Sequence, residues 1–322
     1  MRPEHVAVIG AGAWGTALAQ VAALAGRDVT LVGRDAAVIA EVNDRHTSTP
    51  HLGSAILSDR IRARGEVPEA DLYILAVPAQ ASRSVLAPLR GLLMGRPVVL
   101  SAKGLEAGSL RRQSEILAET APGAHPYVLS GPSFAVDVAL GRPTAVTLAG
   151  EDAEATSALA AALAGPTFRL YAADDIVGVE LAGALKNVYA LASGAVEGAG
   201  LGASARSALL ARAFAEMTRL IVAMGGEAHT LTGLAGLGDL TLSCTSSQSR
   251  NYRHGMALGS GRSLAGIGLA EGVATTPVAK RLAGQLGIDA PLIDAVDLLL
   301  GGLTTINDIV AGLMRRPLKR EN

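Results

Sequence analysis

The chain has 322 residues, a length that predicts about two domains rather than one core. Its formal net charge of −1 and its 3% of aromatic residues argue against nucleic acid as a partner, because basic patches and stacking rings are both scarce. One cysteine excludes an intramolecular disulfide, and no signal-peptide pattern or long uncharged apolar run is present, so we expect a cytoplasmic protein without a membrane span.

Residues 6–32 predict a strand, a glycine-rich loop, a helix and a second strand in succession. Residues 6–9 are apolar, Gly10, Gly12 and Gly15 follow in the spacing GxGxxG, and the predicted helix covers residues 16–25 before a strand at 29–32. In such a unit the first glycine makes a tight turn, the second lets backbone approach a pyrophosphate, and the third packs helix on strand. The segment therefore predicts a dinucleotide-binding fold. Trp14, inside the loop, is interpreted as a wall of the nicotinamide site or as a cover for the sheet edge.

The end of the second predicted strand bears on the choice of cofactor. Arg34 suits the 2′-phosphate of NADPH, whereas the acid Asp35 suits the ribose 2′-hydroxyl of NADH. Because Arg34 comes first after the strand, the sequence favours NADPH and leaves NADH open.

Further strands are predicted at residues 71–77, 97–100, 127–129 and 144–148. In an open α/β sheet, ligands bind beyond the carboxyl ends of the strands. Lys103 follows one of these ends and Ser133 follows another, each in a turn that contains glycine. Lys103 is therefore a candidate clamp for a phosphate or a carbonyl, and the alternative is a solvated loop lysine.

The pattern changes near residue 175, where alanine- and leucine-rich segments with helical spacing replace the β-branched runs. Helices are predicted at residues 180–194, 204–224, 293–300 and 305–314. The predicted fold class is α/β, with a Rossmann-type doubly wound sheet over residues 1–174 and an all-α domain over residues 175–322.

Lys186 and Asn187 stand side by side in the middle of the 180–194 helix, among small and apolar residues. No acidic residue one helical turn away offers the lysine a partner. An ammonium group in such a setting loses solvation, and proton transfer works best for groups that titrate near the operating pH. Lys186 is thus a candidate acid/base, and the alternative is a lysine that buries its stem and extends its head into water.

Two polar stretches interrupt the helical half. Residues 233–239 are interpreted as a glycine-rich turn that presents Asp239, and residues 244–251 as a hydroxyl-rich stretch that opens a helix. Hydroxyls, the Arg250 guanidinium and helix N–H groups together suit a phosphate or carboxylate. The alternatives are a helix N-cap with a surface arginine, and a plain turn. The histidines show no metal-ligand spacing, so no metal is predicted.

Seven motifs occur in one order across nearly the whole chain: GAGAWGTALA from Gly10, SAKGLE from Ser101, LSGPSFA from Leu129, ELAGALKNVYALASG from Glu180, GLAGLGDL from Gly233, CTSSQSRN from Cys244 and AEGVATT from Ala270. In these motifs the chain resembles the bacterial NAD(P)-dependent glycerol-3-phosphate dehydrogenases. The resemblance implies interconversion of dihydroxyacetone phosphate and sn-glycerol 3-phosphate, a role in glycerophospholipid synthesis, and a homodimer.

The resemblance also implies a role for individual residues. Lys186 would be the general acid/base, with Asp239 and Lys103 as the other catalytic residues. The residues expected to hold the phosphorylated substrate are Lys103, Gly131, Ser133, Lys186, Asp239, Ser249, Arg250 and Asn251. Those expected to hold the cofactor are Gly10, Gly12, Ala13, Trp14, Gly15, Arg34, Lys103, Ala135, Arg250, Leu269 and Glu271. Three positions, Ala13, Asp137 and Ser204, depart from the residues usual in the family, and Ala13 removes a hydroxyl near the pyrophosphate.

Two other functions remain open from the sequence. One is a related NADPH-dependent reductase of a 2-keto or 3-hydroxy acid, against which the Lys186-Asn187 pair and the Ser-Arg-Asn stretch argue. The other is a non-enzymatic NADP(H)-binding regulator that has kept the fold, since fold does not imply function. Such a regulator would leave Lys186, Asp239 and Arg250 unexplained.

Overall fold

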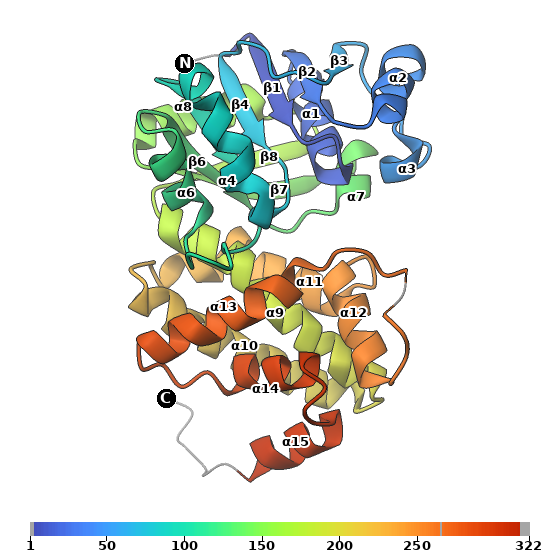
Figure 1. The fold of residues 1–322 in the computed structure, drawn as a ribbon, viewed down its shortest axis with the longest axis vertical. Coiled ribbons are helices and arrows are strands. Elements are labelled where there is room, and N and C mark those ends of the chain that lie inside the picture. Colours follow the sequence, from blue (N-terminus) through green and yellow to red (C-terminus); the bar gives the residue numbers. More distant parts are fainter. Residues whose placement is uncertain (1–2, 265, 316–322) are drawn as a thin grey trace.

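An eight-stranded sheet flanked by helices lies above a body made only of helices (Figure 1). The structure, a computed structural model, describes residues 3–264 and 266–315. The strand order is β3-β2-β1-β4-β5-β6-β7-β8, and all neighbouring strands are parallel except β6 and β7. The predicted doubly wound sheet is therefore confirmed, with one antiparallel pair in it.

The strands carry the buried apolar runs that the sequence shows, and β4 and β5 are buried at every residue, as parallel strands covered on both faces should be. The two strands that the sequence did not predict, β3 and β8, form the two edges of the sheet, where solvent-exposed residues break the apolar run. The strands are β1 (His5–Ile9), β2 (Asp28–Val32), β3 (Ile61–Arg64), β4 (Leu72–Leu75), β5 (Pro97–Leu100), β6 (His125–Ser130), β7 (Thr144–Gly150) and β8 (Phe168–Ala173).

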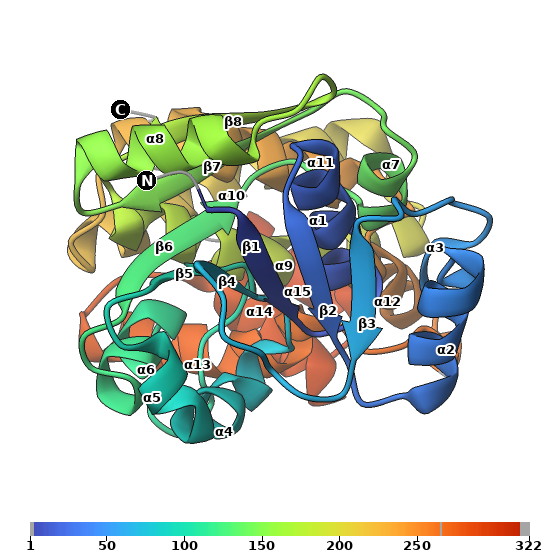
Figure 2. The ribbon, with the colours of Figure 1, turned by 90° about the horizontal axis from the view of Figure 1, so that it is seen from above.

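Helices cover both faces of the sheet, with α1 and α8 packed on one face and α4 and α6 on the other (Figure 2). Helix α1 begins at Ala13, three residues before the predicted start, so Trp14 and Gly15 belong to its first turn. The helices of this half are α1 (Ala13–Leu24), α2 (Ala36–Arg45), α3 (Thr49–Leu52), α4 (Ser82–Leu86), α5 (Arg90–Leu93), α6 (Gln113–Thr120), α7 (Ala135–Ala139) and α8 (Ala153–Leu163), with short 3₁₀ turns η1 (Ala79–Ala81) and η2 (Ala87–Leu89).

Helix α9 (Ile176–Gly198) runs through the centre of the lower body. It is long and apolar enough to cross a membrane, yet 94% of its most apolar window is buried inside the protein, which makes it a core helix. Around it lie α10 (Gly202–Ala223), η3 (His229–Thr232), η4 (Leu234–Gly238), α11 (Asp239–Thr245), α12 (Arg250–Gly259), α13 (Glu271–Gln285) and α14 (Pro291–Leu300), and α15 (Ile306–Met314) packs against α14.

Helices α9 and α12 pack backbone against backbone through four glycines, Gly194 and Gly198 on α9 and Gly255 and Gly259 on α12. A Cβ added to any of the four would lie 2.0 or 2.1 Å from a carbonyl oxygen of the opposite helix, far inside van der Waals contact. This close approach fixes the start of α12, with Arg250, beside the segment of α9 that carries the buried lysine.

The two halves of the chain share their cores. Leu105, in the loop after β5, is fully buried in the core of the helical body, and Leu110 from the same loop packs against that core with a left-handed φ of 64°. Conversely, Ile176 and Val179 of α9 belong to the helical half but pack in the core that lies between the sheet and helices α4 and α6. The predicted domain boundary after residue 174 lies between β8 and α9 and stays a prediction.

Candidate active site

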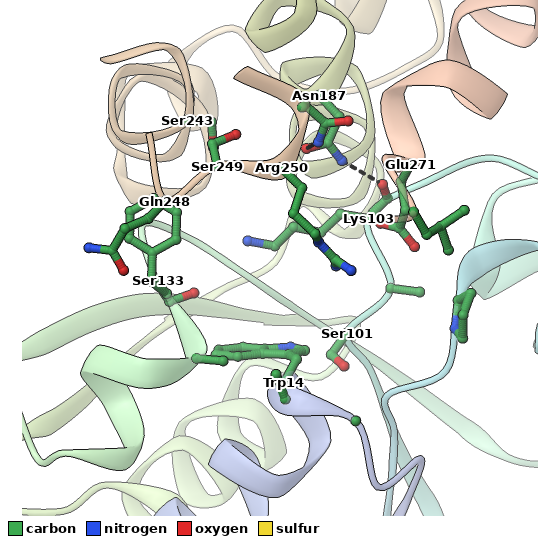
Figure 3. Close-up of a pocket in the computed structure, with 18 of the residues that line it drawn as sticks. Trp14, Ser101, Lys103, Ser133, Asn187, Ser243, Gln248, Ser249, Arg250 and Glu271 are labelled. Atoms are coloured by element: carbon green, nitrogen blue, oxygen red, sulfur yellow. Dashed lines mark hydrogen bonds between the residues drawn. The ribbon is translucent and has the colours of Figure 1, made fainter. Parts of the chain in front are cut away.

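A pocket of about 660 Å³ lies between the sheet and the helical body (Figure 3). Its walls come from the fingerprint loop, from the turns after β4, β5 and β6, and from α9 and α12. This is the edge where the carboxyl ends of parallel strands present their ligand sites. The lining includes Gly12, Ala13, Trp14, Ala76, Lys103, Ser133, Ala135, Lys186, Asn187, Ser243, Ser249, Arg250, Asn251, Leu269 and Glu271.

The fingerprint loop has the form that a pyrophosphate requires. Gly10 has a φ of +117°, and a Cβ there would lie 2.6 Å from the carbonyl oxygen of Ala76. Gly12 faces open space and is the N-cap of α1, where no side chain caps the helix. The first N–H groups of α1 are therefore left for an anion at the positive end of the helix. Residues of this chain thus fit a dinucleotide at this edge.

The indole of Trp14 lies across the pocket opposite Arg250, as Figure 3 shows. Its Nε1 is buried and has no hydrogen-bond partner among the residues that the structure describes. A buried donor of this kind normally finds a partner, so the orphaned N–H marks a place for an acceptor on a bound molecule or a water.

The two candidates for cofactor choice lie outside the pocket lining, just after β2. Asp35 caps α2, and its Oδ1 accepts hydrogen bonds from the N–H groups of Ala37 at 2.9 Å and Val38 at 3.4 Å. Arg34 beside it is exposed. Because Asp35 is engaged as a helix cap, the arginine is the freer of the two for a ribose phosphate.

One carboxylate holds both lysines of the site. The Nζ of Lys186 donates to Asp239 Oδ1 at 2.8 Å, and the Nζ of Lys103 donates to Asp239 Oδ2 at 2.6 Å. Lys186 also donates to Ser243 Oγ at 2.6 Å, and Lys103 to the carbonyl oxygen of Gly131 at 3.0 Å. The expectation that Lys186 has no partner at helical spacing holds, because its acid lies 53 positions further along the chain.

Burial and charge act against each other in this cluster. Burial opposes the charge of Asp239, but the ammonium groups of Lys103 and Lys186 overcome it and hold the pKa of that carboxyl below its usual range. Burial lowers the pKa of Lys103 to about 8; Asp239 opposes this shift, and the charge of Lys186 adds to it. With both lysines protonated, the cluster carries one net positive charge and suits an anionic substrate.

The glycine-rich stretch around residues 233–239 is not the turn that the sequence predicted. It forms a wide helical turn, η4, which continues into α11, so Asp239 is the first residue of a helix. Glycine is needed there for packing, because a Cβ at Gly236 would lie 2.1 Å from the carbonyl oxygen of Leu231. Had the stretch been read as a helix, Ser243, one turn after Asp239, would have been a visible candidate.

A chain of amides ties the site together. Asn187 Nδ2 donates to the carbonyl oxygen of Lys103 at 2.8 Å, and Asn251 Nδ2 donates to Asn187 Oδ1 at 2.8 Å. The N–H of Gly272 then donates to Asn251 Oδ1 at 2.9 Å. Asn251 thus reaches the pocket wall, but these bonds leave its side chain a single N–H for the predicted contact with substrate.

Ser249 and Arg250 open α12 at the pocket wall. Ser249 is the N-cap, and its Oγ accepts from the N–H of Tyr252 at 3.3 Å, so the helix-cap interpretation of this stretch is correct for the serine. The Arg250 side chain has no hydrogen-bond partner among the described residues, and Figure 3 shows its guanidinium directed into the pocket.

Other residues complete the lining. Burial raises the pKa of Glu271, the first residue of α13, although the N–H of Ala79 and the charge of Arg250 oppose this shift. His51 of α3 and Arg253 of α12 also line the pocket, and the sequence did not single them out. The predicted site residues outside the lining are Gly10, Gly15, Arg34, Gly131 and Asp239. Of these, Gly131 accepts a hydrogen bond from Lys103, and Asp239 accepts one from each lysine.

Comparison with known proteins agrees with this geometry. The family described as NAD-dependent glycerol-3-phosphate dehydrogenase matches through its N-terminal part over residues 5–156 and through its C-terminal part over residues 175–311. The chain belongs to this family. Membership confirms the predicted family and fold class, and it makes the chain an NAD(P)-dependent oxidoreductase.

Individual relatives cover the chain almost completely. The glycerol-3-phosphate dehydrogenase, NAD(P)+, of Brucella canis is 50% identical over 98% of this chain and 99% of its own length, and that of Caulobacter vibrioides is 49% identical over 99% of each. The crystal structure of glycerol-3-phosphate dehydrogenase from Coxiella burnetii matches with a TM-score of 0.91 at 35% identity, over 97% of this chain and 99% of that one. A putative ketopantoate reductase from Ralstonia solanacearum, at 20% identity, a TM-score of 0.61 and coverage of 98% of this chain and 99% of its own, shares the fold alone.

Proposed function

We propose that this chain interconverts dihydroxyacetone phosphate and sn-glycerol 3-phosphate with Lys186 as general acid/base, and that its product supplies glycerophospholipid synthesis. The observation that carries the proposal is the cluster at the pocket wall, where Lys186 is buried against Asp239 and Ser243. A proton donor held this firmly can serve a carbonyl oxygen that gains charge during reduction.

NADPH would supply the hydride. The bare N-terminus of α1 would hold its pyrophosphate, and Trp14, Ala135, Leu269 and Glu271 would line the rest of its site. Arg34, which is exposed after β2, would meet the 2′-phosphate, so we expect NADPH to be preferred over NADH.

The substrate phosphate would bind at the start of α12. The backbone N–H groups of Arg250 and Asn251 lie in the first turn of α12, where no carbonyl oxygen of the same helix is positioned to accept their hydrogen bonds. The Arg250 guanidinium adds a charged donor. Such binding, remote from the reacting carbon, helps to hold the carbonyl where the hydride can reach it.

At the reacting carbonyl, the Nζ of Lys186 would give its proton to the oxygen during reduction and take one back during oxidation. Asp239 and Ser243 accept hydrogen bonds from the same Nζ and fix its direction. Lys103, on the other oxygen of Asp239, would contact both substrate and cofactor and add positive charge next to the developing oxyanion.

The family and the fold indicate a small-molecule substrate, whereas a homodimer and a cytoplasmic location remain predictions. Sedimentation of the purified protein would measure the oligomeric state directly.

The first test is the oxidation of NADPH by purified protein on addition of dihydroxyacetone phosphate, repeated with NADH. We expect rapid oxidation that depends on the substrate, faster with NADPH. Ketopantoate and pyruvate, which carry a carboxylate instead of a phosphate, serve as matched controls. If either control compound is turned over and dihydroxyacetone phosphate is not, the proposed function is wrong and the chain is a 2-keto acid reductase.

A further inference from the structure

Two arginines near the start of α12 line the same pocket but are used differently. Arg250 directs its guanidinium into the pocket and has no hydrogen-bond partner among the described residues. Arg253 points its Nη1 back at the preceding turn, where it donates to the carbonyl oxygens of Ser247 at 2.7 Å and Gln248 at 3.2 Å. One arginine is thus free for a ligand, whereas the other is committed to the protein backbone.

The turn that Arg253 holds leads directly into the N-cap of α12. Within it, the N–H of Ser249 donates to the carbonyl oxygen of Ser246 at 3.1 Å, so the backbone closes on itself just before the helix. The peptide group between Gln248 and Ser249 therefore has both ends fixed, its N–H by Ser246 and its carbonyl oxygen by Arg253.

Fixing these peptide groups matters for an anion. A helix N-terminus attracts a phosphate through N–H groups, whereas a carbonyl oxygen turned toward the same place repels it. By holding two carbonyl oxygens, the guanidinium keeps them from rotating toward the pocket. A charged donor is suited to this task, because hydrogen bonds from charged groups are stronger than neutral ones.

We propose that Arg253 is a positioning residue for the substrate phosphate. It fixes the turn 246–249 so that the N-terminus of α12 and the Arg250 guanidinium present their donors to the phosphate. The inference rests on the proposed function, because it gives the start of α12 a phosphate to bind.

The test compares two substrates that differ only in the phosphate, dihydroxyacetone phosphate and dihydroxyacetone. For Arg253→Ala we expect the KM for dihydroxyacetone phosphate to rise about tenfold, as for the loss of one charge-assisted hydrogen bond. We expect kcat, the KM for NADPH and kcat/KM for dihydroxyacetone to stay within about twofold. Arg253→Lys, which keeps a charged donor, should restore part of the loss. Arg262→Ala, in the loop just beyond the opposite end of the same helix, is the matched control and should leave all constants unchanged.

A double-mutant cycle with Arg250→Ala separates positioning from direct contact. If Arg253 acts through the start of α12, the KM for dihydroxyacetone phosphate should rise less in the double variant than the product of the two single-variant increases predicts. Additive losses would mean that Arg253 binds the phosphate by itself, and an equal fall for both substrates would mean that it only stabilises the helix; either result overturns the proposal. If the wild-type protein does not favour the phosphorylated substrate, it is the proposed function that has failed.

Discussion

A single buried carboxylate, Asp239, accepts hydrogen bonds from both lysines that face the pocket. Neither lysine has this partner within its own helix or loop. Removing the carboxylate would leave two buried ammonium groups near each other without compensation, which is among the costliest changes a core can undergo. The acid therefore stabilises the site even before substrate arrives.

Replacement of Lys186 by alanine tests its role as proton donor. We expect kcat for dihydroxyacetone phosphate to fall by about 10²- to 10⁴-fold, the usual contribution of a general acid/base. The dissociation constant for NADPH, measured by fluorescence titration, should change little because the fingerprint loop is untouched.

Lys280→Ala provides the control for the loss of a lysine as such. Lys280 pairs with Asp297 at 2.8 Å on the surface and lies outside the pocket. Its variant should keep wild-type turnover. If the Lys186→Ala protein folds and keeps a near-normal kcat, Lys186 is not the general acid/base.

Because the pKa of Lys103 is lowered to about 8, we expect the binding of the anionic substrate to weaken as the solution becomes alkaline. Below this pH the ammonium is charged and favours the anionic substrate; as the pH rises through about 8 the charge is lost. We therefore expect the KM for dihydroxyacetone phosphate to increase between pH 7 and pH 9.5. In Lys103→Arg the guanidinium keeps its charge over this range, so the increase should disappear. A wild-type KM that stays flat over the range would contradict the prediction.

At the residue scale, the sequence indicated the parts of the site better than their partnerships. The motifs place Lys103, Lys186 and Arg250 in one pocket, as the structure does. Asp239 was visible as the carboxylate of a glycine-rich stretch, but its pairing with the two lysines was not, because these contacts span 53 and 136 positions of the chain. Ser243 was missed because the glycines before it were interpreted as a turn.

At the scale of elements, the glycine contact between α9 and α12 sets the distance from the buried lysine to the start of α12. Four carbonyl oxygens occupy the space that side chains would need. The two helices are thus held in one register, and any outward shift of α12 would carry Arg250 away from Lys186. Substrate binding and helix packing are therefore coupled.

Gly255→Ala should expose this coupling. A Cβ there would lie 2.0 Å from the carbonyl oxygen of Leu191, so the helices must separate. We expect the free energy of unfolding to fall by about 1–3 kcal/mol, as for other overpacked sites, and the KM for dihydroxyacetone phosphate to rise. Gly284→Ala, in α13 where nothing lies within 4 Å of the added Cβ, is the control and should be neutral or stabilising by up to about 1 kcal/mol. Equal stability of the two variants in denaturant titrations would refute the role of the contact.

Uniform burial did not by itself fix the boundaries of an element, since β4 is buried throughout yet covers only Leu72–Leu75 of the predicted 71–77. Strand β5, in contrast, occupies the predicted residues. The edge strands β3 and β8 escaped prediction because their apolar residues are interrupted by exposed ones. The early start of α1 escaped it because three loop residues of the fingerprint are already helical.

On the scale of the whole molecule, the interlocked cores predict cooperative unfolding. Leu105 and Leu110 leave the sheet half to pack in the helical body, while Ile176 and Val179 pack in the other direction. We expect one transition in calorimetry, and a fragment of residues 1–174 that does not fold alone, because separation would expose these side chains to water. Two resolved transitions, or a stable folded fragment, would contradict this view.

The position of α9 in the chain has a consequence for how the protein is made on the ribosome. The helices that enclose it, α10 to α14, all follow it in sequence. Until they have left the exit tunnel, the nascent polypeptide presents a long apolar helix with no cover on that side. The newly made chain therefore exposes an apolar, aggregation-prone surface during synthesis, and this exposure ends only when the last enclosing helix has left the exit tunnel and packed on α9.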